Sequence, residues 1–318
     1  MQKLHIITCI SNPVRFESRY RLYREFAQRI ANEANAQLWT VEIAFSDRPH
    51  EVTEPGNPHH LQLRSDFELW HKENMLNLML QRLPDDGNPV AFIDADVDFM
   101  RPDWVEETIQ QLRHYDVVQM FGEAIDLDAD HKRIGTENRR GVVAQYHAGV
   151  PVCQKDSADG YGNDGVATKQ GGHPGYAWAW RRSAINAVGG LIDFSILGSA
   201  DWQMACGLLG KIEDSINYQI SDGYMRHLQE WGTKARRLRR NVGYVEGMLV
   251  HYWHGPKGKR GYDWRTNILT RSNFDPQVDL HRDWQGVHQL YDDGSDRSLD
   301  LRDDLRRYFR SRNEDHPA

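Results

Sequence analysis

The stretch PVAFIDADVDFMRPDW, residues 89–104, decides the fold class of this chain. Its first residues are apolar and typical of a buried strand, and carboxylates follow at Asp94, Asp96 and Asp98. Alternation along a strand places residues i, i+2 and i+4 on one face, so we expect the three charges to share a small volume. Because like charges repel one another there, the pattern predicts that something positive binds where this strand ends.

Strand-like and helix-like segments alternate ahead of this stretch. Strands are expected at 3–10 and 36–45 and helices at 17–34 and 68–83, with a Pro-, His- and Gly-rich loop at 47–60. The βαβαβ order predicts a single large α/β domain, Rossmann-like, with a doubly wound, mostly parallel sheet and helices on both faces. Ligands of such sheets bind beyond the carboxyl ends of the strands, which is where the carboxylates fall.

The pattern continues after the carboxylates. Asp103 with Glu106 three residues later has the form of a capping box and predicts a helix from there to about His114. The segment 116–122 is expected to form a further strand. Residues 126–172 are rich in Gly and Asp and have little periodicity, so we expect a long loop region there.

The composition is ordinary for a folded protein, with 39% hydrophobic and 27% charged residues among 318. No apolar run approaches the ~18 residues that span a bilayer, and the amino terminus lacks the pattern of a signal peptide, so we expect a cytoplasmic protein. Cys9, Cys153 and Cys206 form no CxxC pair. Reduced thiols are therefore expected in place of disulfides or a Cys-based zinc site.

The net charge of −7 is unevenly distributed along the chain. Between Arg226 and Arg271 there are eleven Lys and Arg residues against three acidic ones. Such a segment is either a solvated face or a site for an anion such as a phosphate-bearing ligand. With an acidic chain overall, the sequence does not indicate a general nucleic-acid binder.

Clustered Asp oxygens suit a hard divalent cation such as Mg²⁺, Mn²⁺ or Ca²⁺. A calcium loop of the EF-hand type fails from Asp94, because the positions that need Gly and Glu hold Phe99 and Val105. The segment 126–137 has acidic residues at four of the required positions but His131 in place of the Gly. We keep calcium binding there as an alternative to a solvated acidic loop.

The quoted stretch resembles the Asp-x-Asp region of GT-A-fold glycosyltransferases of the family-2 type, here Asp94 and Asp96. In that family a helix with Lys and, five residues on, Asn precedes the Asp-x-Asp strand, and WHKENMLN supplies Lys72 and Asn77. A strand with Glu and, five residues on, an Asp that contacts the nucleotide base is matched by Asp47 in VEIAFSD. The pieces also occur in the family's order.

The resemblance extends into the second half of the chain. In GSADWQMACGLLG, Asp201 stands where the family carries its catalytic base, although Ala200 replaces the Glu that usually precedes it. A helix N-cap is the alternative role for Asp201. Many GT-A enzymes place a His after the last core strand as a metal ligand, and His251 and His254 are both eligible in VHYWHG. The motif set also resembles that of glycosyltransferase-like proteins of phages and bacteria.

The resemblance implies a glycosyltransferase that uses Mn²⁺ or Mg²⁺ and a nucleotide sugar, most often a UDP-sugar, and inverts the anomeric centre. Asp96 with His251 or His254 would hold the metal, and Asp98 lies outside the family pattern. The residues expected to bind the nucleotide sugar are Thr8, Asp47, Lys72, Asn77, Asp94, Lys257, Arg260 and Arg265. Those expected on the acceptor side, in the segment HPGYAWAW, are His173, Tyr176 and Trp178.

The same resemblance divides the chain into parts. Residues 1–125 would form the nucleotide-sugar-binding half, 126–172 the loop region, 173–290 the acceptor and catalytic half, and 291–318 a charged helical tail that lies on the surface and frays. The acceptor would be a glycan or, favoured slightly by the KARRLRR segment at 234–240, a hydroxymethylated DNA base.

Two other classes remain open on the sequence alone. A metal-dependent nucleotidyltransferase shares the fold and the carboxylate chemistry, but it usually has a Gly-rich basic loop after the first strand, where this chain has ISNPVRFES. A non-catalytic carbohydrate-binding protein would use some of the ten Trp residues to stack on sugars. Neither GxGxxG nor GxxxxGK[ST] is present, so those phosphate-binding routes are unsupported.

Overall fold

The computed structural model describes residues 2–153, 172–216, 218–262 and 264–315. Within them the largest sheet has seven strands in the order β10-β6-β9-β4-β1-β2-β3. Its strands are β1 (Leu4–Ser11), β2 (Ala36–Phe45), β3 (His60–Ser65), β4 (Val90–Ile93), β6 (Val117–Gln119), β9 (Ala177–Trp180) and β10 (Val242–Tyr244). All neighbouring pairs are parallel except the two that β9 makes, with β4 and β6. The predicted α/β fold with a mostly parallel sheet is confirmed.

A smaller, four-stranded sheet lies beside the main one. In the described residues its order is β5-β11-β7-β8, and β12 and β13 form a separate antiparallel pair. The strands are β5 (Val97–Phe99), β7 (Glu123–Leu127), β8 (Arg133–Arg140), β11 (Met248–His251), β12 (Leu280–Arg282) and β13 (His288–Leu290). Because β8 and a short helix lie between 126 and 172, the prediction of one long loop region there is wrong for the part that is described.

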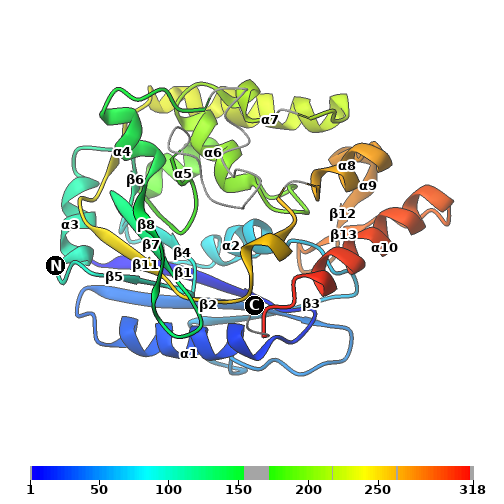
Figure 1. Ribbon diagram of the computed structural model, residues 1–318, viewed down its shortest axis with the longest axis horizontal. Coiled ribbons are helices and arrows are strands. Elements are labelled where there is room, and N and C mark those ends of the chain that lie inside the picture. Colours follow the sequence, from blue (N-terminus) through cyan, green and yellow to red (C-terminus); the bar gives the residue numbers. More distant parts are fainter. Residues whose placement is uncertain (1, 154–171, 217, 263, 316–318) are drawn as a thin grey trace.

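Helices cover both faces of the main sheet, with α1 on one side and α2 on the other (Figure 1). The α-helices are α1 (Glu17–Ala31), α2 (Lys72–Leu80), α3 (Trp104–Gln111), α4 (Val142–His147), α5 (Arg182–Val188), α6 (Ala200–Leu208), α7 (Asp222–Ala235), α8 (Thr266–Ser272), α9 (Pro276–Asp279) and α10 (Asp296–Ser311). The 3₁₀ helices are η2 (Ile212–Ser215), η3 (Arg236–Leu238) and η4 (Lys257–Arg260). No helix in the described part of the chain is long and apolar enough to cross a membrane.

Alternation along β1 explains how the two faces form. Leu4 and Ile6 are fully buried against α1 and α3, whereas Ile7 points to the opposite face and packs with α2 and α5. Each face therefore has its own hydrophobic core, as a doubly wound sheet requires. The carboxyl ends of β1 and β4 are left at the edge between these layers.

One local expectation differs from the structure, and one strand was not predicted. The helix after Pro102 does form, but the Asp103 side chain makes no cap hydrogen bond and instead pairs with Arg101 at 2.6 Å, so the predicted capping box is wrong. The strand β3 follows directly on the 47–60 loop. Its inward residues Leu61 and Leu63 are buried, but the segment is short and lacks the β-branched run that would have marked it as a strand.

Candidate active site

A cavity of about 480 Å³ opens at the carboxyl ends of β1 and β4. Its walls come from segments far apart in sequence: the end of β1, the start of α2, the turn after β4, the start of α6, the segment after β11, and the end of α10. Sequence-predicted residues that line it are Thr8, Lys72, Asp94, Asp96, His173, Tyr176, Asp201, His251, His254, Arg260 and Arg265. The cavity thus brings together most of the residues that the sequence singled out.

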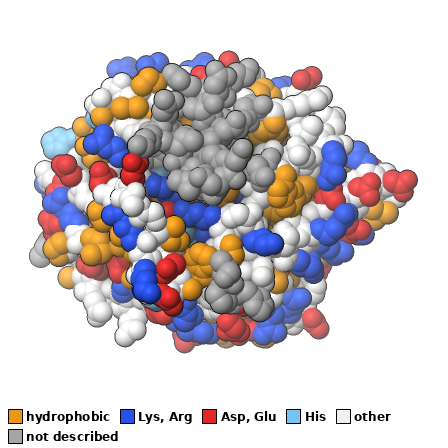
Figure 2. Space-filling model, viewed as in Figure 1, with side chains coloured by type: hydrophobic (Ala, Val, Ile, Leu, Met, Phe, Trp, Pro, Cys, Tyr) orange, Lys and Arg blue, Asp and Glu red, His pale blue; other side chains and the backbone are white. Residues whose placement is uncertain are grey.

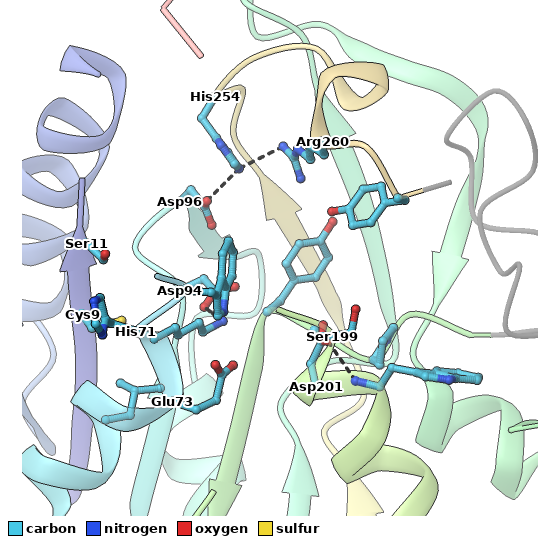
Figure 3. A pocket seen from close by; sticks show the side chains of 18 of the residues that line it. Cys9, Ser11, His71, Glu73, Asp94, Asp96, Ser199, Asp201, His254 and Arg260 are labelled. Carbon is cyan, nitrogen blue, oxygen red and sulfur yellow. Dashed lines mark hydrogen bonds and ion pairs between the residues drawn. The ribbon is translucent and has the colours of Figure 1, made fainter. Parts of the chain in front are cut away.

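The three carboxylates of the opening stretch do not share a face. β4 ends at Ile93, so Asp94 and Asp96 lie in a turn, and Asp98 lies on the separate strand β5. Asp94 forms an ion pair with Lys72, whereas Asp96 turns toward His254, with Oδ2 3.0 Å from Nε2 (Figure 3). Asp98 accepts a hydrogen bond from the Tyr252 hydroxyl at 3.2 Å, outside the cavity. The predicted i, i+4 alternation is wrong because the strand stops before the first carboxylate.

Asp96, His251 and His254 form a cluster in which one ligand atom of each lies within 4.8 Å of the others. His251 Nε2 is 3.2 Å from His254 Nε2 and 3.8 Å from Asp96 Oδ2. The other carboxylate oxygen of Asp96 is buried with no hydrogen-bond partner among the described residues. A cluster of this kind has the composition of a site for Mn²⁺ or Mg²⁺.

The tautomer of His251 supports this interpretation. His251 Nδ1 lies 2.9 Å from Asp126 Oδ1, and a carboxylate only accepts, so Nδ1 carries the proton and Nε2 presents a lone pair. His254 Nε2 lies between an acceptor, Asp96 Oδ2 at 3.0 Å, and a donor, Arg260 Nη2 at 2.9 Å, so these two contacts do not fix its tautomer. The lone pair of His251 Nε2 thus faces the Asp96 carboxylate 3.8 Å away, and a cation between them would satisfy both.

The protonation states are also those that metal ligands need. Burial by itself raises the pKa of Asp96, but His254 and His251 outweigh it and hold the pKa well below its ordinary value. Burial lowers the pKa of His251 to about 4. At neutral pH Asp96 is therefore an ionised carboxylate and His251 a neutral imidazole, as metal binding requires.

Asp126, at the end of β7, holds His251 in place. It is 6% exposed and, besides His251, pairs with Arg139 at 3.2 Å and with Lys257. Burial raises its pKa, but the hydrogen bond from His251 and the charge of Arg139 bring it far below the ordinary value. Residues 126–137 form the end of β7, a turn and the start of β8, so the calcium-loop alternative is wrong.

The end of the chain completes the surroundings of His254. Glu314 is 2% exposed and pairs with Arg19 and Arg312, each at 2.6 Å, and its Oε2 lies 3.5 Å from His254 Nδ1. The Asp315 carboxylate accepts from the backbone N–H groups of the first two residues of α1, at 2.8 and 2.9 Å. The prediction that the tail lies on the surface and frays is therefore wrong for the residues up to 315.

Asp201 lies across the cavity from the cluster of Asp96 and the two histidines (Figure 3). The N-cap of α6 is Ser199 and Asp201 is the second residue of the helix, so the N-cap alternative for Asp201 is wrong. A Cβ on Gly175 would lie 2.9 Å from Asp201 Oδ2, so the glycine lets the backbone approach the carboxylate closely. Ser199 and Tyr176 both have positive φ, 75° and 76°, and such strained non-glycine residues cluster at functional sites.

Aromatic rings form the wall beside the cluster. Tyr176 stacks between His173 and His251, with ring centroids 3.9 and 4.8 Å apart. Burial lowers the pKa of His173 well below its ordinary value, so this imidazole is neutral. Trp178 lies on β9, does not line the cavity, and donates to the Pro174 carbonyl at 2.7 Å.

Of three further residues predicted to bind the nucleotide sugar, Thr8 and Arg265 line the cavity and Lys257 does not. Arg265 donates to the Ser199 hydroxyl at 2.7 Å and stays in the cavity wall, and the buried Thr8 hydroxyl has no hydrogen-bond partner among the described residues. Lys257 does not line the cavity and is engaged by Asp126. Burial and the nearby Arg139 lower the pKa of Lys257 to about 8.

Besides Lys257, two more of the residues predicted to bind the nucleotide sugar do not line the cavity. Asn77 is buried on α2, where it donates to the Leu191 carbonyl at 3.0 Å and accepts from its N–H at 2.8 Å. Asp47 is exposed in the turn after β2 and does not line the cavity. The neighbouring Glu42 instead accepts hydrogen bonds from three backbone N–H groups at 51–53. Asn77 and Asp47 thus match the motif spacing of the family, but neither lines the cavity.

The arginines of the KARRLRR segment are exposed on η3 and just after it, and none of them lines the cavity. Figure 2 shows basic, acidic and hydrophobic side chains intermixed over the described part of one face of the molecule. The described part of that face therefore carries no broad basic surface.

The solved structures described here resemble this chain distantly. No family model matches the chain, and no curated protein sequence matches it. Among solved structures it is similar to a Desulfovibrio desulfuricans protein assigned as a nucleotide-diphospho-sugar transferase, at 15% identity and a TM-score of 0.33, over 97% of this chain and 99% of that one.

Two further solved structures differ in what they do. A Pyrobaculum calidifontis mannosyltransferase in complex with GDP-mannose and Mn²⁺ has 13% identity and a TM-score of 0.38, over 86% of this chain and 61% of that one. The 4-diphosphocytidyl-2C-methyl-D-erythritol synthase of Anaerococcus prevotii has 11% identity and a TM-score of 0.31, over 77% and 89%. Similarities of this size carry no argument about chemistry, which has to come from the site.

Proposed function

We propose that this chain is a metal-dependent glycosyltransferase that moves a sugar from a nucleotide sugar, a UDP-sugar, to an acceptor hydroxyl with inversion. One observation carries the proposal: a single cavity has the Asp96, His251 and His254 cluster on one wall and the Asp201 carboxylate on the other. A diphosphate leaving group needs positive charge, and an attacking hydroxyl needs a base to take its proton. The first wall would supply the positive charge through a bound metal, and the second wall would supply the base.

The donor would bind along the first wall. Asp96, His251 and His254 would hold Mn²⁺ or Mg²⁺, which neutralises charge on the diphosphate leaving group when it is bound. Arg260 and Arg265 would add fixed positive charge that needs no rearrangement during the reaction. Lys72, already paired with Asp94, and the free hydroxyl of Thr8 would orient the nucleotide sugar.

Asp201 would act on the acceptor. As the acceptor oxygen forms its bond to the anomeric carbon, its proton passes to Asp201 and the bond to the diphosphate oxygen breaks. Because base and leaving group lie on opposite walls, attack occurs from the face opposite the leaving group and the configuration inverts. His173 and Tyr176, which line the cavity, would form part of the acceptor side.

Incubation of the protein with UDP-sugars, in Mn²⁺, Mg²⁺ or EDTA, tests the proposal. We expect metal-dependent release of UDP, and acceleration when glycan or hydroxymethylated-DNA acceptors are added. Full activity in EDTA would contradict the metal site. Release of pyrophosphate from a nucleoside triphosphate and a sugar phosphate would identify a nucleotidyltransferase, and binding of sugars without turnover would identify a carbohydrate-binding protein.

A further inference from the structure

Glu73 lines the cavity but has no part in the roles assigned above. It is the second residue of α2 and only 5% exposed, and its carboxyl points into the space between Asp94 and Asp201 (Figure 3). No other described residue forms a hydrogen bond or ion pair with its side chain, and only its own backbone N–H contributes one. The Glu73 carboxyl therefore faces the cavity with hydrogen-bonding capacity that the described residues leave unused, and it is suited to a ligand.

The groups around Glu73 do not neutralise its charge. The adjacent Lys72 is paired with Asp94, and Asp201 faces Glu73 from α6. Among the described residues, two further titratable groups interact with Glu73, Cys9 on β1 and Tyr224 on α7, and neither carries a positive charge. Asp201 also interacts with the charge of Arg265. Because Lys72 is already paired with Asp94, a negative charge on Glu73 is poorly compensated.

Burial is the largest cause of a pKa of about 8 for Glu73, with Lys72 lowering it and Asp201 and Asp94 raising it. At neutral pH the group is then a carboxylic acid, which has one O–H donor and acceptor oxygens. A protonated acid cannot serve as the base that removes the acceptor proton. It can, however, donate one hydrogen bond to a sugar hydroxyl and accept another from it, because a hydroxyl both donates and accepts.

We propose that Glu73 binds a hydroxyl group of the transferred sugar and selects donors that carry a hydroxyl at that position. The inference rests on the proposed function and deepens it, since it assigns the sugar-selecting contact. A donor that lacks the hydroxyl would leave the Glu73 carboxyl buried and unpaired. Sites built to hydrogen-bond a substrate hydroxyl reject the analogue without it far more strongly than apolar pockets reject a change of size.

The test compares Glu73→Met with Glu73→Gln, which have similar lengths but differ in hydrogen-bonding capacity. Binding of the UDP-sugar and of UDP alone is measured by calorimetry with Mn²⁺, together with donor KM for the sugar and its monodeoxy analogues. We expect Glu73→Met to weaken UDP-sugar binding by roughly 10- to 100-fold, as for a lost buried hydrogen bond, and to leave UDP binding unchanged. Glu73→Gln should lose much less, because its amide still donates and accepts.

Two further readouts separate binding from a merely structural role. For one monodeoxy donor, wild type and Glu73→Met should have the same donor KM. The hydroxyl that this donor lacks is then the one that Glu73 binds. The wild-type donor KM should rise above about pH 8, where Glu73 loses its proton, and this rise should be absent in Glu73→Gln. Melting curves without ligand establish that both variants fold.

Equal losses of UDP and UDP-sugar binding in Glu73→Met, or an unchanged preference among deoxy donors, would overturn the inference and leave the proposed function intact. If wild type binds neither UDP nor any UDP-sugar in the presence of metal, it is the proposed function that fails, and the inference falls with it.

Discussion

His251 Nδ1 lies 2.9 Å from Asp126 Oδ1, so the ring's proton points away from the cavity and its other nitrogen points into it. The two residues are 125 positions apart and meet because β11 and β7 are parallel neighbours in the smaller sheet. Carboxylates in this position fix the tautomer and orientation of a metal-binding imidazole and raise its basicity.

Asp126→Asn should therefore lower Mn²⁺ affinity by about 10- to 100-fold without removing any ligand atom. The measurement is Mn²⁺ titration followed by electron paramagnetic resonance or calorimetry. Asp130→Asn, an exposed carboxylate in the turn that follows, is the matched control and should bind Mn²⁺ like wild type. Wild-type affinity in Asp126→Asn would show that His251 is not oriented for a metal.

Asp201→Asn should reduce kcat by roughly 10² to 10⁴, the usual contribution of a general base, and leave donor affinity nearly unchanged. The amide has the same shape but does not take up the acceptor proton. Since Ser199, not Asp201, occupies the N-cap of α6, the variant should also melt close to wild type. A normal kcat with weakened donor binding would show that Asp201 binds the donor and does not act as the base for the acceptor.

The sequence predicted the parts of this molecule that depend on local pattern. The strand 36–45 was placed with the bounds of β2, and the order of elements gave the parallel sheet and the edge at which the cavity lies. Asp96, His251 and His254 could be named because their segments resemble the Asp-x-Asp region and the His-bearing segment of GT-A enzymes. The periodicity of apolar residues carries the information about the fold, and the motifs carry the information about the metal ligands.

What depends on contacts between distant segments could not be predicted. Asp126 was assigned to a loop, because nothing near it in sequence shows that it will face His251. Glu314 reaches Arg19 across 295 positions, which no periodicity encodes. Asn77 has the spacing of a binding residue, but its helix is rotated so that the side chain faces Leu191. Glu73 looks like the exposed start of a helix until the walls of the cavity enclose it.

The end of the chain should contribute to stability through two separable contacts. Asp315→Ala removes the side chain that caps α1 and should cost about 1 kcal/mol, a typical value for a lost N-cap. Glu314→Ala leaves the largely buried Arg19 and Arg312 without their shared anion and should cost roughly 3 to 5 kcal/mol. Urea denaturation of each variant measures both values. Equal, small losses would mean that the tail does not dock in solution.

Buried His71 should make the protein less stable as the pH falls. It is 1% exposed, its Nε2–H donates to the Phe67 carbonyl at 3.0 Å, and burial lowers its pKa from 6.5 to about 4. Between these values the unfolded chain takes up a proton that the folded protein excludes. The free energy of unfolding should therefore decrease on going from pH 6.5 to pH 4, by roughly 3 kcal/mol at most from this group.

Denaturation curves of His71→Gln over this pH range check the effect, because the variant should lose that part of the slope. The exposed His114, replaced in the same way, is the control and should keep the wild-type slope. Identical slopes for wild type and His71→Gln would mean that His71 titrates normally in the folded protein.

The KARRLRR segment separates the two acceptors that remain in the proposal. Replacing Arg236, Arg237, Arg239 and Arg240 with Gln should leave UDP release in the absence of an acceptor unchanged, because none of these exposed residues lines the cavity. With a hydroxymethylated-DNA acceptor, the variant should have a higher acceptor KM and a flatter dependence on salt. Each lost phosphate contact removes close to one unit from the slope of log K against log salt. With a neutral glycan acceptor, neither quantity should change. An unaltered salt slope with DNA would dismiss a guiding role for the segment, leaving it as solvated surface, and would favour the glycan as the acceptor.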